Sequence, residues 1–251
     1  TEIALVNGAS GTTSVNGIGY SVSLVGGTAT ITLTSAGLAT ATAQGVVDGM
    51  TYRNGSEVPS EGTRTLTLTS VRDSGGTGNG GVDSATTAIA ASVAVVAVND
   101  APVITAPGSI AVTEDLSQAL TGISFSDVDA GSGSVIASFS VTGGTLSAFS
   151  GSGVTVAGSG SASLTLTGTV ADINAFIAAN GLSFTGGANA NGNVTLGVGI
   201  NDGGNIGSGG ALSDNASVTL AVTAVNDAPV NSLPAGQHVA QDGSLVFNAG
   251  N

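Results

Sequence analysis

The feature that most constrains the fold is a seven-residue phrase that occurs twice. The sequence AVNDAPV at 97–103 returns at 224–230, an offset of 127 residues. The match continues without a gap at three further pairs of positions: Pro107 and Pro234, Val112 and Val239, and Asp115 and Asp242. A period of this size corresponds to one domain, so we interpret the phrase as the joint between successive copies of a domain.

The repeat predicts how the chain is divided. We expect residues 1–98 to be the C-terminal part of a first repeat, 103–225 a complete repeat and 230–251 the start of a third, with joints at 99–102 and 226–229. The sequence is therefore expected to be a segment of a longer array. Pro102 and Pro229 suit joints, because proline fixes its own φ and favours an extended residue before it.

The composition favours strands. Apolar residues make up 41% of the chain but aromatic residues only 3%, so the core must consist mainly of valine, isoleucine, leucine and alanine. Short alternating runs separated by glycine-rich turns are typical of strands. We predict an all-β fold of tandem Ig-like β-sandwich domains, with one short helix per domain.

Alternation and turn signals locate the elements. In the first repeat we predict strands over 18–25, 28–34, 50–53, 64–71 and 86–98, a helix over 40–48 and a glycine-rich loop over 73–83. In the second repeat we predict strands over 109–113, 119–126, 135–141, 153–157, 161–166, 182–184, 193–200 and 216–225. A helix is expected over 170–179, begun by a capping box at Thr169 and Asp172.

The charge balance restricts the possible partners. The chain has 16 acidic residues and three arginines but no lysine, and all three arginines precede Asp73. Nucleic acid is excluded as a partner because it requires basic side chains against phosphate. Clustered carboxylates without basic partners need a cation, and their hard oxygens suit Ca²⁺.

Strand direction predicts which acidic residues meet. If the first strand of the complete repeat runs away from its joint, every second strand runs back toward it. The turn at Asp127 and Asp129 and the loop at Asp202 each follow a strand that runs back, so both should lie near that joint. They would meet Asn99 and Asp100 there. By the same argument Glu57 and Glu61 of the first repeat face this joint from the other side. The predicted site has seven residues with side-chain oxygens, enough for one or more Ca²⁺ ions, each of which takes about 6–8 oxygens.

A second site is predicted at the other joint, from Glu114, Asp115, Asn226 and Asp227. The loop there that corresponds to 57–61 contains no acidic residue, so we expect weaker binding or fewer ions. The alternative for both sites is that alternating acids in turns are solvated surface. Asp48, Asp83, Asp172 and Asp214 are interpreted as turn or cap residues, and Asp73 is expected to belong to a joint before residue 1.

Four short motifs resemble the cadherin-like tandem repeats of large bacterial surface adhesins. They are the Asn-Asp-Ala-Pro joints, Thr-Glu-Asp at 113–115, Asp-Val-Asp-Ala-Gly at 127–131 and Asn-Asp-Gly-Gly at 201–204. The resemblance implies calcium at the joints, with ligands at Asn99, Asp100, Asp127, Asp129, Asp202, Glu114, Asn226 and Asp227. It also implies an extracellular stalk at the bacterial surface, acting in adhesion and biofilm. Gln241 stands where Glu114 would recur, so the third repeat departs from the pattern.

Two functions remain open at this stage. The first is a calcium-stiffened spacer whose partners are the neighbouring repeats of the same chain. The second is a subunit that assembles with its own copies into an extracellular filament or sheath, with calcium between them. We expect no enzyme, since His238 is the only histidine and cysteine and lysine are absent. No segment predicts membrane insertion, because the most apolar run, 88–98, is too short to cross a bilayer.

Overall fold

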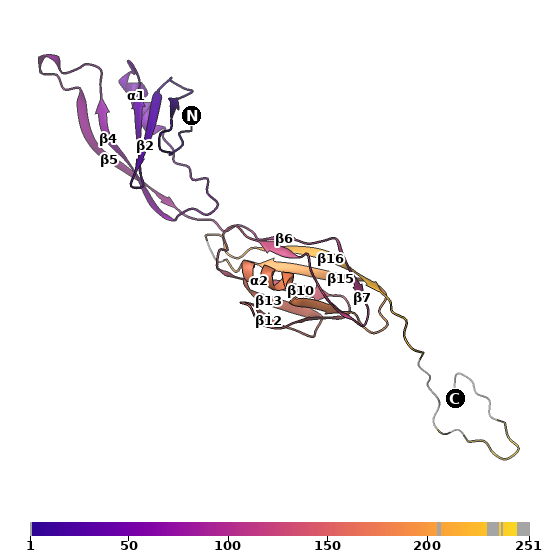
Figure 1. The fold of residues 1–251 in the computed structure, drawn as a ribbon. Coiled ribbons are helices and arrows are strands. Elements are labelled where there is room, and N and C mark those ends of the chain that lie inside the picture. Colours follow the sequence, from indigo (N-terminus) through magenta and orange to yellow (C-terminus); the bar gives the residue numbers. More distant parts are fainter. Residues whose placement is uncertain (1, 205–206, 230–235, 237, 245–251) are drawn as a thin grey trace. The chain divides into compact units, whose positions relative to one another are not determined.

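The fold was analysed in a computed structural model, which describes residues 2–204, 207–229, 236 and 238–244. The chain is rich in strands, with 16 strands and two α-helices among the described residues (Figure 1). It divides into two compact units, Thr1–Val96 and Ala97–Asn251. The joint phrase therefore begins the second unit.

The main sheet of the second unit has six strands in the order β12-β13-β10-β15-β16-β7. Their bounds are β7 Ser109–Thr113, β10 Ser134–Val141, β12 Thr155–Ala157, β13 Ser163–Thr169, β15 Gly192–Asn201 and β16 Ser213–Thr223. All neighbours are antiparallel except β7 and β16, which are parallel. The central position of β10, between β13 and β15, joins the two halves of the sheet.

Shorter elements form the other layer. Three strands make a sheet in the order β11-β14-β8, and a separate pair is formed by β6 and β9. Their bounds are β6 Val103–Thr105, β8 Ser117–Ala119, β9 Ser124–Ser126, β11 Thr145–Ala148 and β14 Leu182–Thr185. The helix α2, Val170–Ala178, is tied to β9 because Asn174 Nδ2 donates to the Phe125 carbonyl (2.8 Å) and Asn174 Oδ1 accepts from Phe125 N (2.9 Å).

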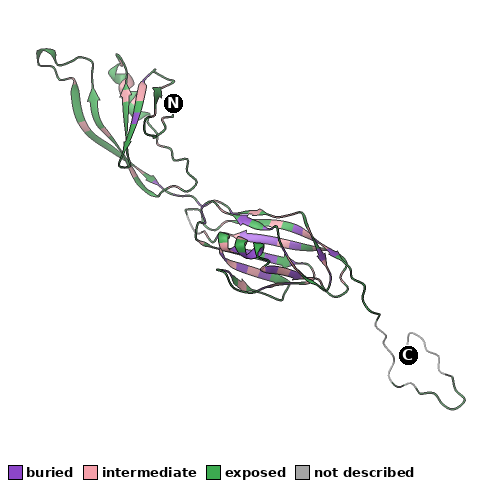
Figure 2. Ribbon diagram, in the orientation of Figure 1, coloured by how far each residue is buried: buried purple, intermediate pink, exposed green. Residues whose placement is uncertain are grey.

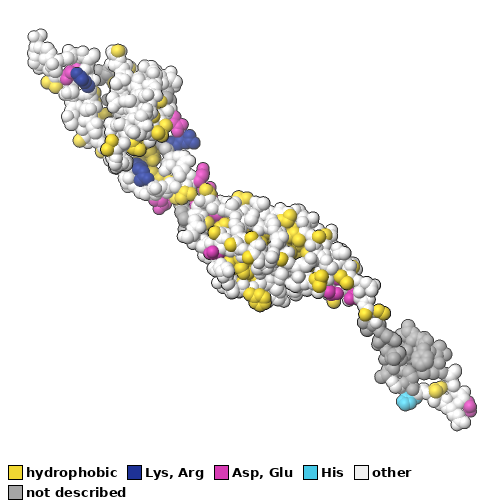
Figure 3. All heavy atoms as spheres, in the orientation of Figure 1, with side chains coloured by type: hydrophobic (Ala, Val, Ile, Leu, Met, Phe, Trp, Pro, Cys, Tyr) yellow, Lys and Arg dark blue, Asp and Glu magenta, His cyan; other side chains and the backbone are white. Residues whose placement is uncertain are grey.

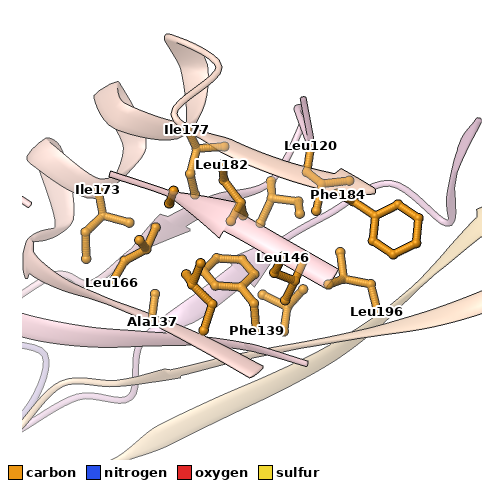
Figure 4. Packing of buried hydrophobic residues seen from close by; sticks show 14 of the residues in the cluster. Leu120, Ala137, Phe139, Leu146, Leu166, Ile173, Ile177, Leu182, Phe184 and Leu196 are labelled. Carbon is orange, nitrogen blue, oxygen red and sulfur yellow. The ribbon is translucent and has the colours of Figure 1, made fainter. Parts of the chain in front are cut away.

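One hydrophobic core lies between these layers (Figure 4). Burial alternates strictly along β10, where Val135, Ala137, Phe139 and Val141 are buried and the residues between them are exposed. This is the pattern of a strand with one face against a core. The helix adds Ile173, Phe176 and Ile177 to the same cluster. Figure 2 shows buried residues running along the strands of this unit.

The first unit contains two separate sheets. One has the order β1-β2-β3, and the other is the hairpin of β4 and β5. The bounds are β1 Ser10–Thr12, β2 Gly19–Val25, β3 Thr28–Thr34, β4 Gly62–Arg72 and β5 Ser84–Val95. The helix α1, Thr40–Asp48, and a 3-10 turn, Gly78–Gly80, complete it. Among its described apolar residues only Ile18, Val22 and Val95 are buried.

Most predicted elements are found at or near their expected positions. The helices begin at the predicted residues, and Thr169 caps α2 by accepting a hydrogen bond from Asp172 N (3.1 Å). Two predictions were wrong. Residues 50–53 form no strand, and the strand expected over 119–126 is broken into β8 and β9 because the chain turns between them, at Gly122 with a φ of +78°. The short strands β1, β6 and β11 were not predicted.

Candidate metal centre

Strand directions bring acidic residues to both ends of the second unit. β7 and β16 are parallel and run from the entry of the chain toward its exit. β15 is antiparallel to β16, so β15 ends near the entry, and β10 is antiparallel to β15. On the face seen in Figure 3, acidic side chains of this unit lie at its ends, and the flank between them is uncharged. We call the residues at the entry the entry-end group (Asn99, Asp100, Asp127, Asp129 and Asp202). We call those at the exit the exit-end group (Glu114, Asp115, Asn226 and Asp227).

The residues of the entry-end group are unusually buried for polar side chains. Asn99 is 5% exposed, Asp129 3% and Asp202 1%, while Asp100 and Asp127 are half-buried. Carboxylates are rarely buried unless they are paired or bind a metal. No lysine or arginine is present anywhere in this unit to pair with them.

Asp202 is held by a ring of donors at the end of β15. Its Oδ1 accepts from Gly204 N and Leu212 N, both at 2.8 Å, and its Oδ2 accepts from Asn99 Nδ2 at 2.6 Å. Burial alone would raise the pKa of Asp202. These hydrogen bonds, with that from Asn99 foremost, outweigh burial and lower the pKa below its ordinary value. Asp202 is therefore ionised and fixed in place.

The turn after β9 presents two carboxylates, each with one oxygen already engaged. Asp127 Oδ1 accepts from Asp129 N and Ala130 N, both at 3.1 Å. Asp129 Oδ2 accepts from Asp100 N at 2.9 Å. Burial, together with the neighbouring Asp129 carboxylate, raises the pKa of Asp127. The Asp129 carboxylate and burial therefore destabilise the charged form of Asp127.

Three buried oxygens of the entry-end group have no hydrogen-bond partner among the described residues: Asn99 Oδ1, Asp127 Oδ2 and Asp129 Oδ1. Buried acceptors nearly always accept a hydrogen bond in folded proteins. Each buried acceptor without a partner costs about 1–3 kcal/mol, and more when it is charged. Oxygen ligands from carboxylates and an amide are the kind that Ca²⁺ takes. The donor set therefore fits calcium.

The exit-end group is more compact. Glu114, Asp115 and Asp227 each offer a carboxylate oxygen within 4.8 Å of the others. Glu114 is 1% exposed. Its Oε1 accepts from Val225 N at 2.7 Å, and its Oε2 has no partner in the part of the chain that is described. Asp115 turns outward at a left-handed φ of +60°, and Asp227 is exposed. Two opposite ligands of one Ca²⁺ ion lie about 5 Å apart, so this spacing also fits one ion.

The spacing differs at the entry end, where no three described carboxylates have oxygens mutually within 4.8 Å. In this arrangement an ion there would take the Asn99 amide oxygen with one or two carboxylates. Asn226 at the exit end is exposed, and its Nδ2 donates only to the Asp227 carbonyl (3.4 Å). The entry-end and exit-end groups thus differ in the arrangement of their oxygens.

Glu57 and Glu61 lie in the first unit, where both are exposed. The prediction that they approach the joint stays a prediction. The sequence did not predict that the glycine-rich loop after Asp202 makes hydrogen bonds to the joint phrase. Asn99 N donates to the Ser208 carbonyl (2.9 Å), and Asn99 Nδ2 donates to the Gly210 carbonyl (3.0 Å).

Glycine is required at the closest point of this contact. A Cβ at Gly207 would lie 2.7 Å from Asn99 N, and the residue has a φ of +97°. The loop therefore approaches the joint backbone to within contact, and Ser208 N donates to the Ala97 carbonyl (2.9 Å). The signal in the sequence was the density of glycine after Asp202, which was interpreted only as a loop. The joint phrase is part of the second unit, not a free connection.

Comparisons with known proteins add little. No protein-family model matches the chain, and no curated protein matches it. A similarity was found to a chain of a structure described as the complete structure of manganese lipoxygenase of Gaeumannomyces graminis and partial structure of zonadhesin of Komagataella pastoris. It has 13% identity and a TM-score of 0.24, and covers 82% of this chain and 66% of that one. A TM-score this low does not indicate a common fold.

Two further observations bear on function. No helix among the described residues is long and apolar enough to cross a membrane. A groove of about 480 Å³ lies over the outer face of the main sheet. Its lining, mostly serine, glycine and alanine, includes no titratable side chain.

Proposed function

We propose that the chain is part of a tandem array of cadherin-like β-sandwich repeats, stiffened by Ca²⁺ at the ends of each repeat. The array acts as an extracellular spacer or stalk of a cell-surface adhesin and carries out no catalysis. The observation that carries the proposal is the set of buried, unpartnered oxygens on Asn99, Asp127 and Asp129, in a unit without lysine or arginine.

Electrostatics supports a cation at this place. Removing a carboxylate from water costs several kcal/mol unless a charge of opposite sign compensates it. Asp129 is 3% exposed, and the only charged groups of its entry-end group are negative. A divalent cation removes both the desolvation cost and the repulsion that raises the pKa of Asp127.

The mechanical consequence follows from where the ligands lie. Asn99 and Asp100 belong to the phrase that connects repeats, and Asp127, Asp129 and Asp202 belong to the body of the second unit. An ion held by both sets ties the phrase to the body more firmly than its hydrogen bonds alone. In the proposed array Glu57 and Glu61 add ligands from the preceding repeat, which fixes the angle between neighbours.

Calcium titration of residues 1–251 by isothermal calorimetry tests the site. We expect saturable binding that is lost at the entry end in the double variant Asp127→Asn, Asp129→Asn, since amides keep the shape but remove the charge. The control Glu2→Gln, Asp48→Asn removes two exposed charges from the other unit and should bind as the wild type does. Equal binding by both variants would contradict the site.

Small-angle scattering tests stiffening separately. Calcium should increase the maximum dimension or narrow its distribution, and a chelator should reverse the change. The double variant should scatter like the chelated wild type at all calcium concentrations. Binding without any change in scattering would remove the spacer mechanism but leave the calcium site.

A second function is favoured by a different observation. The first unit leaves Ile89 68% exposed and Val25 77% exposed on its strands, which is unusual for a protein that stays monomeric. Assembly with other copies into an extracellular filament would cover such surface.

A further inference from the structure

Asp202 differs from the other buried side chains of the entry-end group in how its oxygens are used. Asn99, Asp127 and Asp129 each keep one buried oxygen without a hydrogen-bond partner among the described residues. Both oxygens of Asp202, by contrast, accept hydrogen bonds from the protein itself. The Asp202 carboxylate is therefore satisfied at 1% exposure without any cation.

The neighbours of the Asn99 amide fix which way it points. Asn99 Nδ2 lies 2.6 Å from Asp202 Oδ2 and 3.0 Å from the Gly210 carbonyl oxygen. An ionised carboxylate and a carbonyl can only accept hydrogen bonds, so the reversed amide would set Asn99 Oδ1 against two acceptors. The amide nitrogen must therefore face Asp202, and the amide oxygen must face away from it. That oxygen is the buried acceptor without a donor in the described part of the chain.

The other open oxygens belong to the turn that is bonded to the next residue of the joint phrase. Asp100 N donates to Asp129 Oδ2 (2.9 Å), and Asp129 N donates to Asp127 Oδ1 (3.1 Å). The phrase is thus held to Asp202 through Asn99 and to the turn of Asp127 and Asp129 through Asp100. The open oxygens come from Asn99 and from this turn, and none comes from Asp202.

We infer that Asp202 is a positioning residue and not a ligand of the ion. It holds the Asn99 amide so that the oxygen, and not the nitrogen, is offered to a cation bound by Asn99, Asp127 and Asp129. The inference rests on the proposed function and deepens it, and it departs from the ligand role that the resemblance to cadherin-like repeats implies for Asp202.

Asp202 also connects this amide to the glycine-rich loop. Its Oδ1 accepts from Gly204 N and Leu212 N, both at 2.8 Å, so one carboxylate joins the two ends of the loop. Asp73 forms the same local turn in the first unit, where Gly75 N donates to its Oδ1 (2.8 Å). The turn is a common property of aspartate before glycine, which makes Asp73 a matched control for the contact that Asp202 makes with Asn99.

Adding a carboxylate at position 99 distinguishes a ligand from a positioning residue. If Asp202 were one more ligand, Asn99→Asp would bring a further negative charge to the site and calcium should bind at least as tightly. In the inferred arrangement the added oxygen lies against Asp202 Oδ2 and the Gly210 carbonyl. We therefore expect the calcium affinity at neutral pH to fall by about tenfold or more.

The exchange variant Asn99→Asp, Asp202→Asn keeps the net charge and reverses the hydrogen bond. The amide at position 202 then donates to the carboxylate at position 99 and still offers an oxygen to Gly204 N and Leu212 N. Asp202→Asn alone sets two amide nitrogens against each other and should bind weakly. We expect the exchange variant to bind at least about threefold more tightly than either single variant. The Gly210 carbonyl, which still faces a carboxylate oxygen, should keep it below the wild type.

Isothermal calorimetry with calcium measures all three variants, and Asp73→Asn should bind as the wild type does. The exit-end group is unchanged throughout and serves as an internal reference. An Asn99→Asp chain that binds as tightly as the wild type would overturn the inference. So would an exchange variant that binds no more tightly than Asp202→Asn.

Thermal unfolding in chelator tests the pairing of Asn99 with Asp202 without calcium. Each single variant should lower the melting temperature of the second unit by about 4 °C or more, and the exchange variant should unfold at a higher temperature than either. Strictly additive losses would overturn the pairing. Non-additive losses in a wild type that binds no calcium would refute the proposed function and the ligand role of Asn99, but would confirm that Asp202 orients the amide.

Discussion

The helices α1 and α2 have the same length and the same place in their repeats, yet only α2 is packed. Each has nine residues, and each is preceded by a strand hairpin. In α2, Ile173, Phe176 and Ile177 are buried, whereas no residue of α1 is buried. The sequence pattern of α1 is sufficient to form a helix, but the first unit has no core against which this helix is buried.

The cause is the strand that joins the halves of the main sheet. In the second unit β10 lies between β13 and β15 and makes them one sheet. The counterparts in the first unit, β3 and β4, belong to separate sheets, and no described strand connects them. Local sequence therefore determines the elements of a repeat, but the larger core forms where one strand joins the two halves of the sheet.

The largest expected effect tests this difference in the helices. Ile177→Ala should lower the free energy of unfolding of the second unit by about 2–5 kcal/mol, because Ile177 is 1% exposed in the core. The matched change in α1, Val47→Ala, should shift the first unit by less than about 0.5 kcal/mol, because Val47 is 40% exposed. Denaturant titration followed by circular dichroism measures both.

The two units can be separated in such an experiment. Both tyrosines, Tyr20 and Tyr52, lie in the first unit, and the chain has no tryptophan. Tyrosine fluorescence therefore reports the first unit alone, while the total helix and strand signal reports both. Equal losses in the two variants would mean that the burial contrast does not reflect stability.

Calcium is expected to stabilise mainly the second unit, which holds five of the seven residues proposed at the first joint. At a free calcium concentration 100 times the dissociation constant, binding stabilises the folded state by about 2.7 kcal/mol. For a unit of this size that corresponds to an increase in melting temperature of roughly 5–11 °C. Calorimetry should show the larger increase in the transition of the second unit, and tyrosine fluorescence should show a smaller increase for the first unit, which contributes only Glu57 and Glu61. The same increase in Asp127→Asn, Asp129→Asn would contradict the assignment at the entry end.

Much of the secondary structure could be predicted from sequence, because alternation and turn residues act locally. Strands such as β7 and both helix starts are found where the pattern places them. The convergence of Asp127, Asp129 and Asp202 with the joint also followed. Although the strand count was wrong, β9 still returns Ser126 to a position opposite Val103, and β15 is antiparallel to β16.

What could not be predicted depends on packing over long distances. The hydrogen bonds from Asn99 to the carbonyls of Ser208 and Gly210 span more than 100 residues, and no local signal marks them. The same holds for the burial of Glu114, which is 1% exposed: β16 lies parallel to β7 and brings Val225 N to the Glu114 carboxylate. Composition also gave no indication that the core of the first unit would be so much smaller.

Helix capping gives a smaller contrast between the units. Thr169 accepts from Asp172 N at the start of α2, whereas Ala39 precedes α1 and has no side chain that can cap it. Thr169→Ala should cost about 1 kcal/mol, and Ala39→Thr should stabilise the first unit by a similar amount or less. Thermal unfolding of both variants checks the opposite signs. A loss of stability in Ala39→Thr would show that α1 is limited by its packing and not by its cap.

The smallest effect concerns pH in the absence of calcium, where the carboxylates of the entry-end group oppose each other. The pKa of Asp127 is raised in the folded unit, so folding favours its protonated form, and the free energy of unfolding should rise as pH falls through that pKa. Asp202 acts in the opposite direction. Its pKa lies below the ordinary value of 3.8, so it stabilises the fold above that pH, and the contribution is lost as pH falls further.

Denaturant titrations in chelator from about pH 6 to about pH 3 should show a small gain in the free energy of unfolding followed by a loss. Asp127→Asn should remove the gain and keep the loss, and calcium should abolish the gain in the wild type, because a bound cation removes the repulsion from which it arises. A gain that persists in Asp127→Asn would place the repulsion elsewhere and leave Asp127 without its proposed role.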